Sequence, residues 1–218
     1  MKPIAVLVVA KAPVPGRAKT RLAAGVGPEA AADIAAAALL DTLAAVADAA
    51  VAARVVALTG DLGQARCGSE IRDRLDDFIV VPQRGRDFAE RLANAHVDAA
   101  AATGLPVLQI GMDTPQVTAA LLDACGRALS DADAVLGMAR DGGWWVLGVR
   151  DSRTAACLAD VEMSTSCTGA ATLAALRDTG ATVTLVAELA DVDTVGDIDE
   201  VRRACVPDSR FVRATREF

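Results

Sequence analysis

The feature of this sequence that most constrains its fold is a regular alternation of short apolar runs with longer alanine-rich stretches. The apolar runs predict strands over residues 4–10, 51–58, 78–81, 105–110, 134–138, 144–149 and 182–187. The stretches between them predict helices over residues 28–48, 87–102, 115–129, 168–179 and 194–204. Because continuously apolar strands must be covered on both faces, the pattern predicts a mostly parallel sheet between two helical layers.

We therefore expect an α/β fold, a three-layer α/β/α sandwich with a Rossmann-like sheet. The alternation breaks over residues 139–166, which predicts an antiparallel excursion within the sheet. The chain has 218 residues and no linker-like segment, so we expect a single domain over residues 1–218. In open sheets of this kind ligands bind beyond the carboxyl ends of the strands, and the loops there are where functional residues are expected.

Composition excludes several classes of function. With 22 basic and 29 acidic residues the net charge is −7, which argues against a general nucleic-acid-binding protein. A single histidine, His96, excludes multi-histidine metal sites, and we interpret it as a surface or packing residue. The five cysteines show no CxxC spacing and favour a reducing, cytoplasmic environment.

The N-terminal segment resembles an export signal, because Lys2 precedes an apolar run over residues 4–10. That run is rich in β-branched residues and leads directly into a basic loop, so we interpret it as a buried strand. We identify no apolar stretch close to the ~20 residues that span a bilayer, and we expect no membrane span.

The loop after the first predicted strand is the strongest functional signal. It contains a glycine and four cations, which are Lys11, Gly16, Arg17, Lys19 and Arg21. Backbone amides near the glycine, together with these cations, would suit a di- or triphosphate through charge-assisted hydrogen bonds. The loop matches neither the Walker A nor the GxGxxG pattern, and a solvated basic loop stiffened by prolines is the alternative.

A second signal, Gly111-Met112-Asp113-Thr114-Pro115, follows the strand predicted at 105–110. Thr114 before Pro115 is placed to cap the next helix, which leaves Asp113 without an evident structural role. Its carboxylate is therefore a candidate ligand for Mg²⁺ or Mn²⁺, which take oxygen ligands and bridge phosphate oxygens.

A third signal is the sequence Asp141-Gly142-Gly143-Trp144-Trp145. The two glycines predict a hairpin turn in which Asp141 bonds its own backbone. The functional alternative is that Asp141 is a metal ligand or general base and that an indole forms an apolar wall against a sugar or acceptor. Tryptophan in a strand is also common in a core, so both interpretations stay open.

Two further segments carry weaker signals. Asp87 is placed to cap the helix that bears Arg91. Near the chain's end, Thr194 and Asp197 have the spacing of a capping box. Asp191 and Asp193, which precede that box, are either acids that complement the helix dipole or site residues.

Taken together, these segments resemble a family of small bacterial GT-A-fold, glycosyltransferase-like proteins, one branch of which is associated with arsenosugar biosynthesis. The matching stretches cover nearly the whole chain in the expected order and lie at residues 11–22, 83–92, 111–115, 141–148 and 191–197. Two departures are Phe88-Ala89, where the family has Leu-Gly, and Trp144, where it prefers tyrosine. The first loop is also similar to that of 2-phospho-lactate guanylyltransferases and molybdenum-cofactor nucleotidyltransferases.

The resemblance implies a nucleotide-diphospho-sugar transferase fold with a nucleotide-binding first half. By the same likeness Gly16, Arg17, Lys19 and Arg21 would face phosphates, and Asp113 would hold a metal ion. A further set of candidates contains nucleotide-binding, substrate-binding and metal-binding positions: Lys11, Gln83, Gly85, Arg91, Gly142, Gly143, Trp144 and Asp193.

The expected function is transfer from a nucleotide-diphosphate sugar to a small-molecule acceptor, with Mg²⁺ or Mn²⁺ as cofactor. Asp113, Asp141 and Lys19 are the candidate catalytic residues. The alternative reaction is nucleotidyl transfer, in which a phosphorylated small molecule attacks a nucleoside triphosphate and pyrophosphate leaves. A third class is a binding module that retains the fold without turnover, because fold analogy alone does not select a reaction.

Overall fold

The structure of the chain is a computed structural model that describes residues 2–218, except for the side chain of Lys2. Its centre is a seven-stranded sheet in the order β3-β2-β1-β4-β6-β5-β7. The strands are β1 (Lys2–Lys11), β2 (Val51–Thr59), β3 (Ile79–Pro82), β4 (Val107–Gly111), β5 (Ala134–Ala139), β6 (Trp144–Val149) and β7 (Val183–Leu189). Strand β6 pairs antiparallel with β4 and β5, whereas the other pairs are parallel. The expected parallel sheet with an antiparallel excursion is confirmed.

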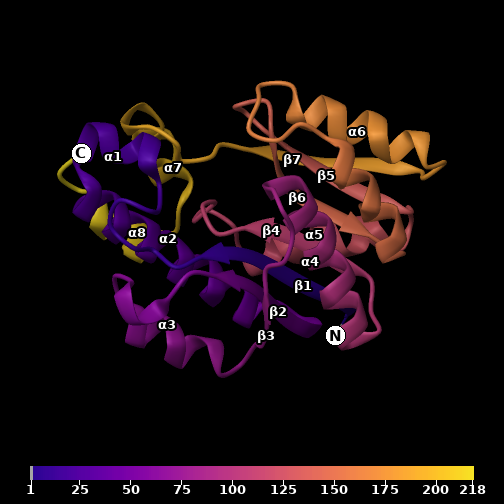
Figure 1. Cartoon of the computed structure of the whole chain (residues 1–218), viewed down its shortest axis with the longest axis horizontal. Helices are drawn as coiled ribbons and strands as arrows, with labels where there is room; N and C mark the ends of the chain where they lie inside the picture. Colours follow the sequence, from indigo (N-terminus) through magenta and orange to yellow (C-terminus); the bar gives the residue numbers. More distant parts are fainter. Residues whose placement is uncertain (1) are drawn as a thin grey trace.

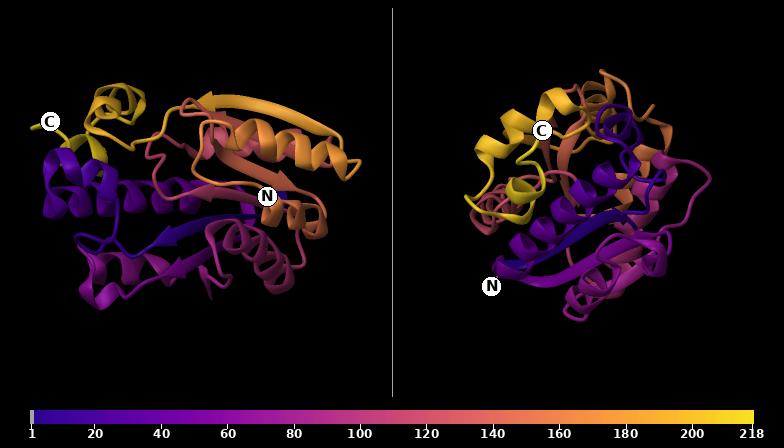
Figure 2. Two further views of the ribbon diagram at one scale, coloured as in Figure 1. Left: turned by 45° about the horizontal axis from the view of Figure 1, so that its top comes forward. Right: turned by 90° about the vertical axis from the view of Figure 1, so that its left-hand side faces the viewer.

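Helices cover both faces of this sheet (Figures 1 and 2). They are α1 (Thr20–Val26), α2 (Pro28–Asp48), α3 (Gly68–Leu75), α4 (Phe88–Thr103), α5 (Ala119–Ser130), α6 (Thr168–Asp178), α7 (Val195–Ala204) and α8 (Arg210–Ala214). Two 3₁₀ segments, η1 (Leu62–Gln64) and η2 (Ser152–Asp160), complete the set. Side chains of α2, α3 and α5 pack on one face of the sheet, and those of α4, η2 and α6 pack on the other.

Alternation along the central strand β1 produces these two cores. Val6 and Val8 pack with α2 and α5, whereas Leu7 points to the opposite face and packs with α4. Each of these side chains is fully buried, which contributes roughly 1.5–3 kcal/mol apiece relative to exposure. A smaller apolar cluster joins α1, α2, α7 and α8 at the end of the molecule where these helices gather in Figure 1.

Helix α2 corrects the expectation that no apolar stretch approaches membrane-spanning length. Its 21 residues are long and apolar enough to cross a bilayer by length and composition. In this fold, however, 67% of the most apolar 18-residue stretch of the helix is buried, and Leu39 and Leu43 lie in the core beside β1. The helix is apolar because it is covered by the sheet on one side and by α1 and α8 on another.

One predicted helix start was wrong, and three short α-helices were not predicted. The helix after β4 begins at Ala119 instead of Pro115, because Thr118 caps it by accepting a hydrogen bond from the Leu121 amide at 3.2 Å. Thr114 is buried one turn earlier, and its carbonyl accepts the Val117 amide within a turn. The helices that were not predicted are α1, α3 and α8, and α1 begins inside the segment interpreted as a loop.

Candidate active site

A cleft of about 520 Å³ crosses the edge of the sheet where the parallel strands end. It is lined by residues at or next to these strand ends, among them Lys11 on β1, Thr59 on β2 and Gly111 on β4. Trp144, the first residue of the antiparallel strand β6, lies at the same edge. A second cavity of about 420 Å³ adjoins the cleft and shares Lys11, Arg17 and Arg91 with it. The predicted location of the site beyond the carboxyl ends of the strands agrees with this geometry.

Lys19 holds together two loops that are far apart in the sequence. Its ammonium nitrogen donates to Oδ2 of Asp113 at 2.7 Å and to Oδ1 of Asp193 at 3.2 Å. It also donates to the carbonyl oxygen of Val192 at 2.7 Å, so three acceptors surround it. The lysine side chain is only 12% exposed. Arg21, at the start of α1, adds a 3.1 Å ion pair with Asp193.

This contact shifts the pKa of both partners toward their charged forms. Burial opposes ionisation of Lys19, but the charges and hydrogen bonds of Asp113 and Asp193 raise its pKa above the ordinary value. Burial likewise opposes ionisation of Asp113, yet the charge and hydrogen bond of Lys19 lower its pKa. Lys19 and Asp113 therefore form an ion pair at neutral pH.

Asp113, Asp141, Asp191 and Asp193 line the same cleft, and we call these four residues the carboxylate cluster. Burial, followed by the negative charges of Asp113 and Asp141, raises the pKa of Asp191 to about 8. Oδ1 of Asp191 is buried and has no hydrogen-bond partner among the described residues. With Asp191 mostly protonated at neutral pH, the other three carboxylates of the cluster stand against the two positive charges of Lys19 and Arg21, so the cluster keeps an excess of negative charge.

The cations of the cleft fall into two groups. Lys19 and Arg21 are paired with carboxylates, as described above. Lys11, Arg17 and Arg91 have no ion pair among the described residues, and all three line both cavities. Arg91 only approaches the carbonyl oxygen of Gly85, at 3.4 Å. The charges available to an anionic ligand are therefore these three, and one of them comes from α4 instead of the first loop.

The turn between β5 and β6 presents Asp141 to the cleft. The carboxylate accepts the amide of Gly143 at 2.8 Å, so the predicted backbone-bonding turn is present and Asp141 also lines the cavity. Gly142 has φ 91°, and a Cβ there would collide with the carbonyl oxygen of Ser166. Its own carbonyl accepts the Gly169 amide at 2.7 Å, which fixes the turn against the start of α6.

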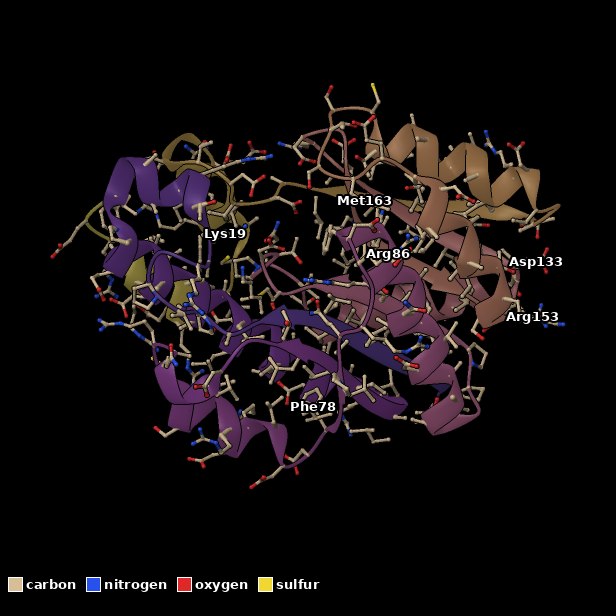
Figure 3. The ribbon with its side chains drawn as sticks, viewed as in Figure 1. Lys19, Phe78, Arg86, Asp133, Arg153 and Met163 are labelled. Carbon is tan, nitrogen blue, oxygen red and sulfur yellow. The ribbon has the colours of Figure 1, made fainter. Side chains whose placement is uncertain are left out.

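The two tryptophans have different surroundings. The Trp145 indole is buried in the core and donates to the carbonyl oxygen of Ala187 at 2.7 Å. Trp144 is half-buried and lines the cleft with Met163. Lys19, from the loop after β1, and Met163, from the segment before α6, both line this cleft and are labelled in Figure 3.

Other predicted site residues divide between the cleft and its surroundings. The Gln83 side chain donates to the carbonyl oxygens of Ala10 and Ala57 and lines the cleft. Gly143 lines it as well, whereas Gly85 and Gly142 do not, and Gly16 lines only the second cavity.

Two buried polar residues had no functional role assigned from the sequence. Of the two interpretations of His96, surface or packing, the structure agrees with packing, because His96 is fully buried and burial lowers its pKa to about 3. Gln109 lies on β4 in a run that was interpreted as apolar, yet it lines the cleft at 1% exposure. A lone amide within an apolar strand was the signal that could have identified it.

The carboxylate cluster suits Mg²⁺ or Mn²⁺ by its chemistry, because these ions prefer oxygen donors and the cluster has excess negative charge. No three acidic, histidine or cysteine side chains of residues 2–218 are grouped closely enough to bind an ion by themselves. That arrangement fits an ion held by one or two carboxylates and completed by phosphate oxygens and water, the usual mode for Mg²⁺.

The sheet order and the cleft at its carboxyl edge define the α/β fold of nucleotide-diphospho-sugar transferases. The chain itself belongs to the bacterial family DUF2064, whose model matches residues 42–165 and whose description reads "uncharacterized protein conserved in bacteria". The family resemblance and the fold class expected from the sequence are thereby confirmed. No curated protein sequence matches the chain significantly.

Solved structures extend the comparison. A Desulfovibrio desulfuricans G20 protein, provisionally assigned as a nucleotide-diphospho-sugar transferase, is 26% identical, with 100% of this chain and 95% of that chain covered and a TM-score of 0.86. Rv0371c from Mycobacterium tuberculosis H37Rv is 20% identical, with 92% and 97% covered and a TM-score of 0.58. A Leptospira borgpetersenii cytidylyltransferase is 13% identical, with 99% and 93% covered and a TM-score of 0.60. The last two similarities concern the fold alone.

Proposed function

We propose that this protein is a metal-dependent glycosyltransferase that uses a nucleotide-diphosphate sugar as donor. The observation that carries the proposal is that one cleft contains both unpaired cations and a group of carboxylates. Three unpaired cations, Lys11, Arg17 and Arg91, share the cleft with a carboxylate cluster that has excess negative charge. A diphosphate needs the first group, and a divalent ion that bridges its oxygens needs the second.

In this mechanism the diphosphate of the donor lies on Lys11, Arg17 and Arg91. Asp113 and Asp193 are the proposed ligands of Mg²⁺ or Mn²⁺, which when bound would neutralise charge on the departing diphosphate. Lys19 orients Asp113 by its 2.7 Å contact and keeps that carboxylate ionised. Preorganised charges of this kind stabilise the transition state without reorganisation during the reaction.

The acceptor would enter from the side of β6. Asp141 is the proposed group that accepts the proton of the attacking hydroxyl, since it lines the cleft on a turn that is fixed against α6. Its backbone hydrogen bond leaves Oδ2 available for that role. Trp144 would form the apolar wall beside the acceptor, and Gln83 would lie toward the nucleoside.

The relatives give independent support for this proposal. The Desulfovibrio protein that matches over the full chain carries a nucleotide-diphospho-sugar transferase assignment. Rv0371c has been crystallised with manganese, which supports a divalent ion in proteins of this fold.

Nucleotidyl transfer is the second candidate, because the three unpaired cations suit the charge of a triphosphate as well as that of a diphosphate. Here the phosphate of an acceptor attacks the α-phosphorus and pyrophosphate leaves. The shared fold of the Leptospira cytidylyltransferase is compatible with this reaction.

Purified protein with Mg²⁺ or Mn²⁺, incubated separately with nucleotide sugars and nucleoside triphosphates, tests the two candidates. We expect release of nucleoside diphosphate from a nucleotide sugar, slowly to water and faster with an acceptor. Pyrophosphate release that requires an added phosphate-bearing acceptor would replace this proposal with the second candidate. Nucleotide binding with no turnover of either donor would indicate a binding module.

A further inference from the structure

The side-chain oxygen Oε1 of Gln109 is buried in the lining of the cleft without a hydrogen-bond partner among the described residues. The residue as a whole is 1% exposed. Burying an unsatisfied amide is costly, because the group loses water without gaining a replacement. Because Gln109, unlike Thr172, also lines the cleft, a ligand bound there is in a position to supply the missing hydrogen bond.

The position of Gln109 defines which part of the cleft such a ligand occupies. Along β4, Leu108 and Ile110 face the α2 and α5 side, and Val107 faces the α4 side. Alternation places Gln109 with Val107, on the α4 side. On that side Leu92, Trp144 and Met163 belong to one apolar cluster and also line the cleft.

An exposed aromatic ring extends this apolar wall. Phe88 lies one helical turn before Leu92 on α4, lines the cleft and is 50% exposed. The chain has only 6 aromatic residues, which are four phenylalanines and two tryptophans. Phe78, Phe211 and Trp145 are used in the core, so the cleft receives two of the remaining three rings.

The cleft residues that come from the β5–β6 turn and from the segment at the start of α6 include no cation. Residues that line the cleft from the β5–β6 turn and from the segment before α6 are acids, hydroxyl residues, a glycine and the two apolar walls: Asp141, Gly143, Trp144, Met163, Ser164, Thr165 and Thr168. The nearby cation Arg140 does not line the cleft and pairs with Glu188 and Glu200. On this side a phosphorylated acceptor would meet the negative charge of Asp141 and no cation from these two segments, while Arg91, which lines the cleft from α4, is the cation assigned above to the diphosphate of the donor.

We propose that this end of the cleft binds a neutral, polyhydroxylated ring, such as a glycoside, with a ring hydroxyl bonded to the Gln109 amide. The apolar face of the ring lies against the indole of Trp144, and the hydroxyl-bearing residues take its other hydroxyls. This inference rests on the proposed function and names its acceptor class. It also predicts discrimination against the phosphate ester of the same ring.

The test uses methyl glucosides and methyl mannosides as probes, with glucose 6-phosphate and mannose 6-phosphate as charged counterparts. Binding is followed by saturation-transfer NMR and by tryptophan fluorescence, with Mg²⁺ and a nucleoside diphosphate present. We expect at least one neutral glycoside to bind and to change the fluorescence of Trp144. Its phosphorylated counterpart should bind at least tenfold more weakly.

The variant Gln109→Leu separates a ligand role from a structural role. Replacing the unsatisfied amide by an apolar group of similar size should leave the melting temperature unchanged or raise it, and should weaken glycoside binding at least tenfold. Thr172→Val is the matched control, because Thr172 is another fully buried polar side chain without a partner, on α6 and outside the cleft. Thr172→Val should neither lower the melting temperature nor weaken glycoside binding.

Three results would overturn the inference. They are equal glycoside binding by Gln109→Leu and wild type, tighter binding of the phosphorylated probe, and no binding of any neutral probe. Release of nucleoside diphosphate from a nucleotide sugar, measured in parallel, distinguishes these from failure of the proposed function. If that release persists, only the acceptor class is wrong.

Discussion

Lys19 Nζ and Asp113 Oδ2 lie 2.7 Å apart although 94 positions separate the residues in the sequence. The lysine comes from the loop after β1 and the aspartate from the loop after β4, two adjacent parallel strands. Their ion pair joins the cationic side of the cleft to the carboxylate cluster, and the proposed mechanism depends on it.

Removing the lysine charge should destabilise the protein and reduce its activity. In Lys19→Met, Asp113 and Asp193 lose their common partner, and we expect a loss of about 2 kcal/mol of unfolding free energy. This is less than the 3–5 kcal/mol typical of a fully buried pair, because both carboxylates are about one-third exposed. Urea denaturation measures the change. Arg66→Met, which breaks an exposed pair with Asp33, should cost less than about 1 kcal/mol, and equal losses would contradict the account.

Neutralising Asp113 should affect turnover far more than folding. Asp113→Asn keeps the size of the side chain and loses the charge of the proposed metal ligand. We expect nucleoside diphosphate release to fall at least about 100-fold, the usual magnitude for one preorganised electrostatic group. Circular dichroism should show an unchanged fold. Asp160→Asn, an exposed aspartate outside the cleft, serves as the control and should retain full activity.

The unpaired cations should contribute to nucleotide affinity where paired ones do not. Arg91→Ala should raise the Kd for a nucleoside diphosphate about tenfold or more, because a hydrogen bond to a charged group contributes about 1.5–3 kcal/mol. Arg84→Ala removes the same charge from an arginine that is held by Asp98 and lies outside the cleft. Calorimetric titration should show little change for Arg84→Ala. Similar effects in both variants would point to net charge alone.

His96 should make the protein sensitive to acid. Burial lowers its pKa in the folded state to about 3 from an ordinary 6.5, so between these values the unfolded chain binds a proton that the folded chain does not. Because of His96, the free energy of unfolding of the protein therefore decreases as the pH falls below 6.5, by up to about 1.4 kcal/mol per pH unit.

The variant His96→Leu isolates this contribution. Its unfolding free energy should exceed that of the wild type by an amount that grows between pH 6.5 and pH 4, as measured by chemical denaturation at each pH. Neither ring nitrogen of His96 has a partner among the described residues, so the leucine should cost little at pH 7. A constant difference between the two proteins across this range would refute the assignment.

The sequence predicted the layered fold because its signals are local. Each strand is a short apolar run, and each functional motif follows a strand, so the topology of a parallel sheet brings the motifs to one edge. The caps at Asp87 and Thr194 were also predictable, since a cap depends on residues three positions apart.

The partners of the cations were not predictable in this way. Lys19 adopts a left-handed conformation, φ 48° and ψ 51°, just before α1, and nothing in the neighbouring residues indicates it. Whether it faces a phosphate or Asp113 depends on three loops that meet only in the folded chain. The start of α5 failed for a related reason, because Thr114 and Thr118 both have the local character of a cap and tertiary packing selected the second.

The measurement that tests the central claim most directly is the effect of Mn²⁺ on nucleoside diphosphate binding, in wild type and in Asp113→Asn. The proposed cleft predicts at least about tenfold tighter binding with Mn²⁺ than with a chelator, equivalent to about 1.4 kcal/mol, in the wild type only. The same Kd with and without Mn²⁺ in the wild type, or an equal gain in the variant, would contradict a metal ion held by Asp113 beside the bound diphosphate.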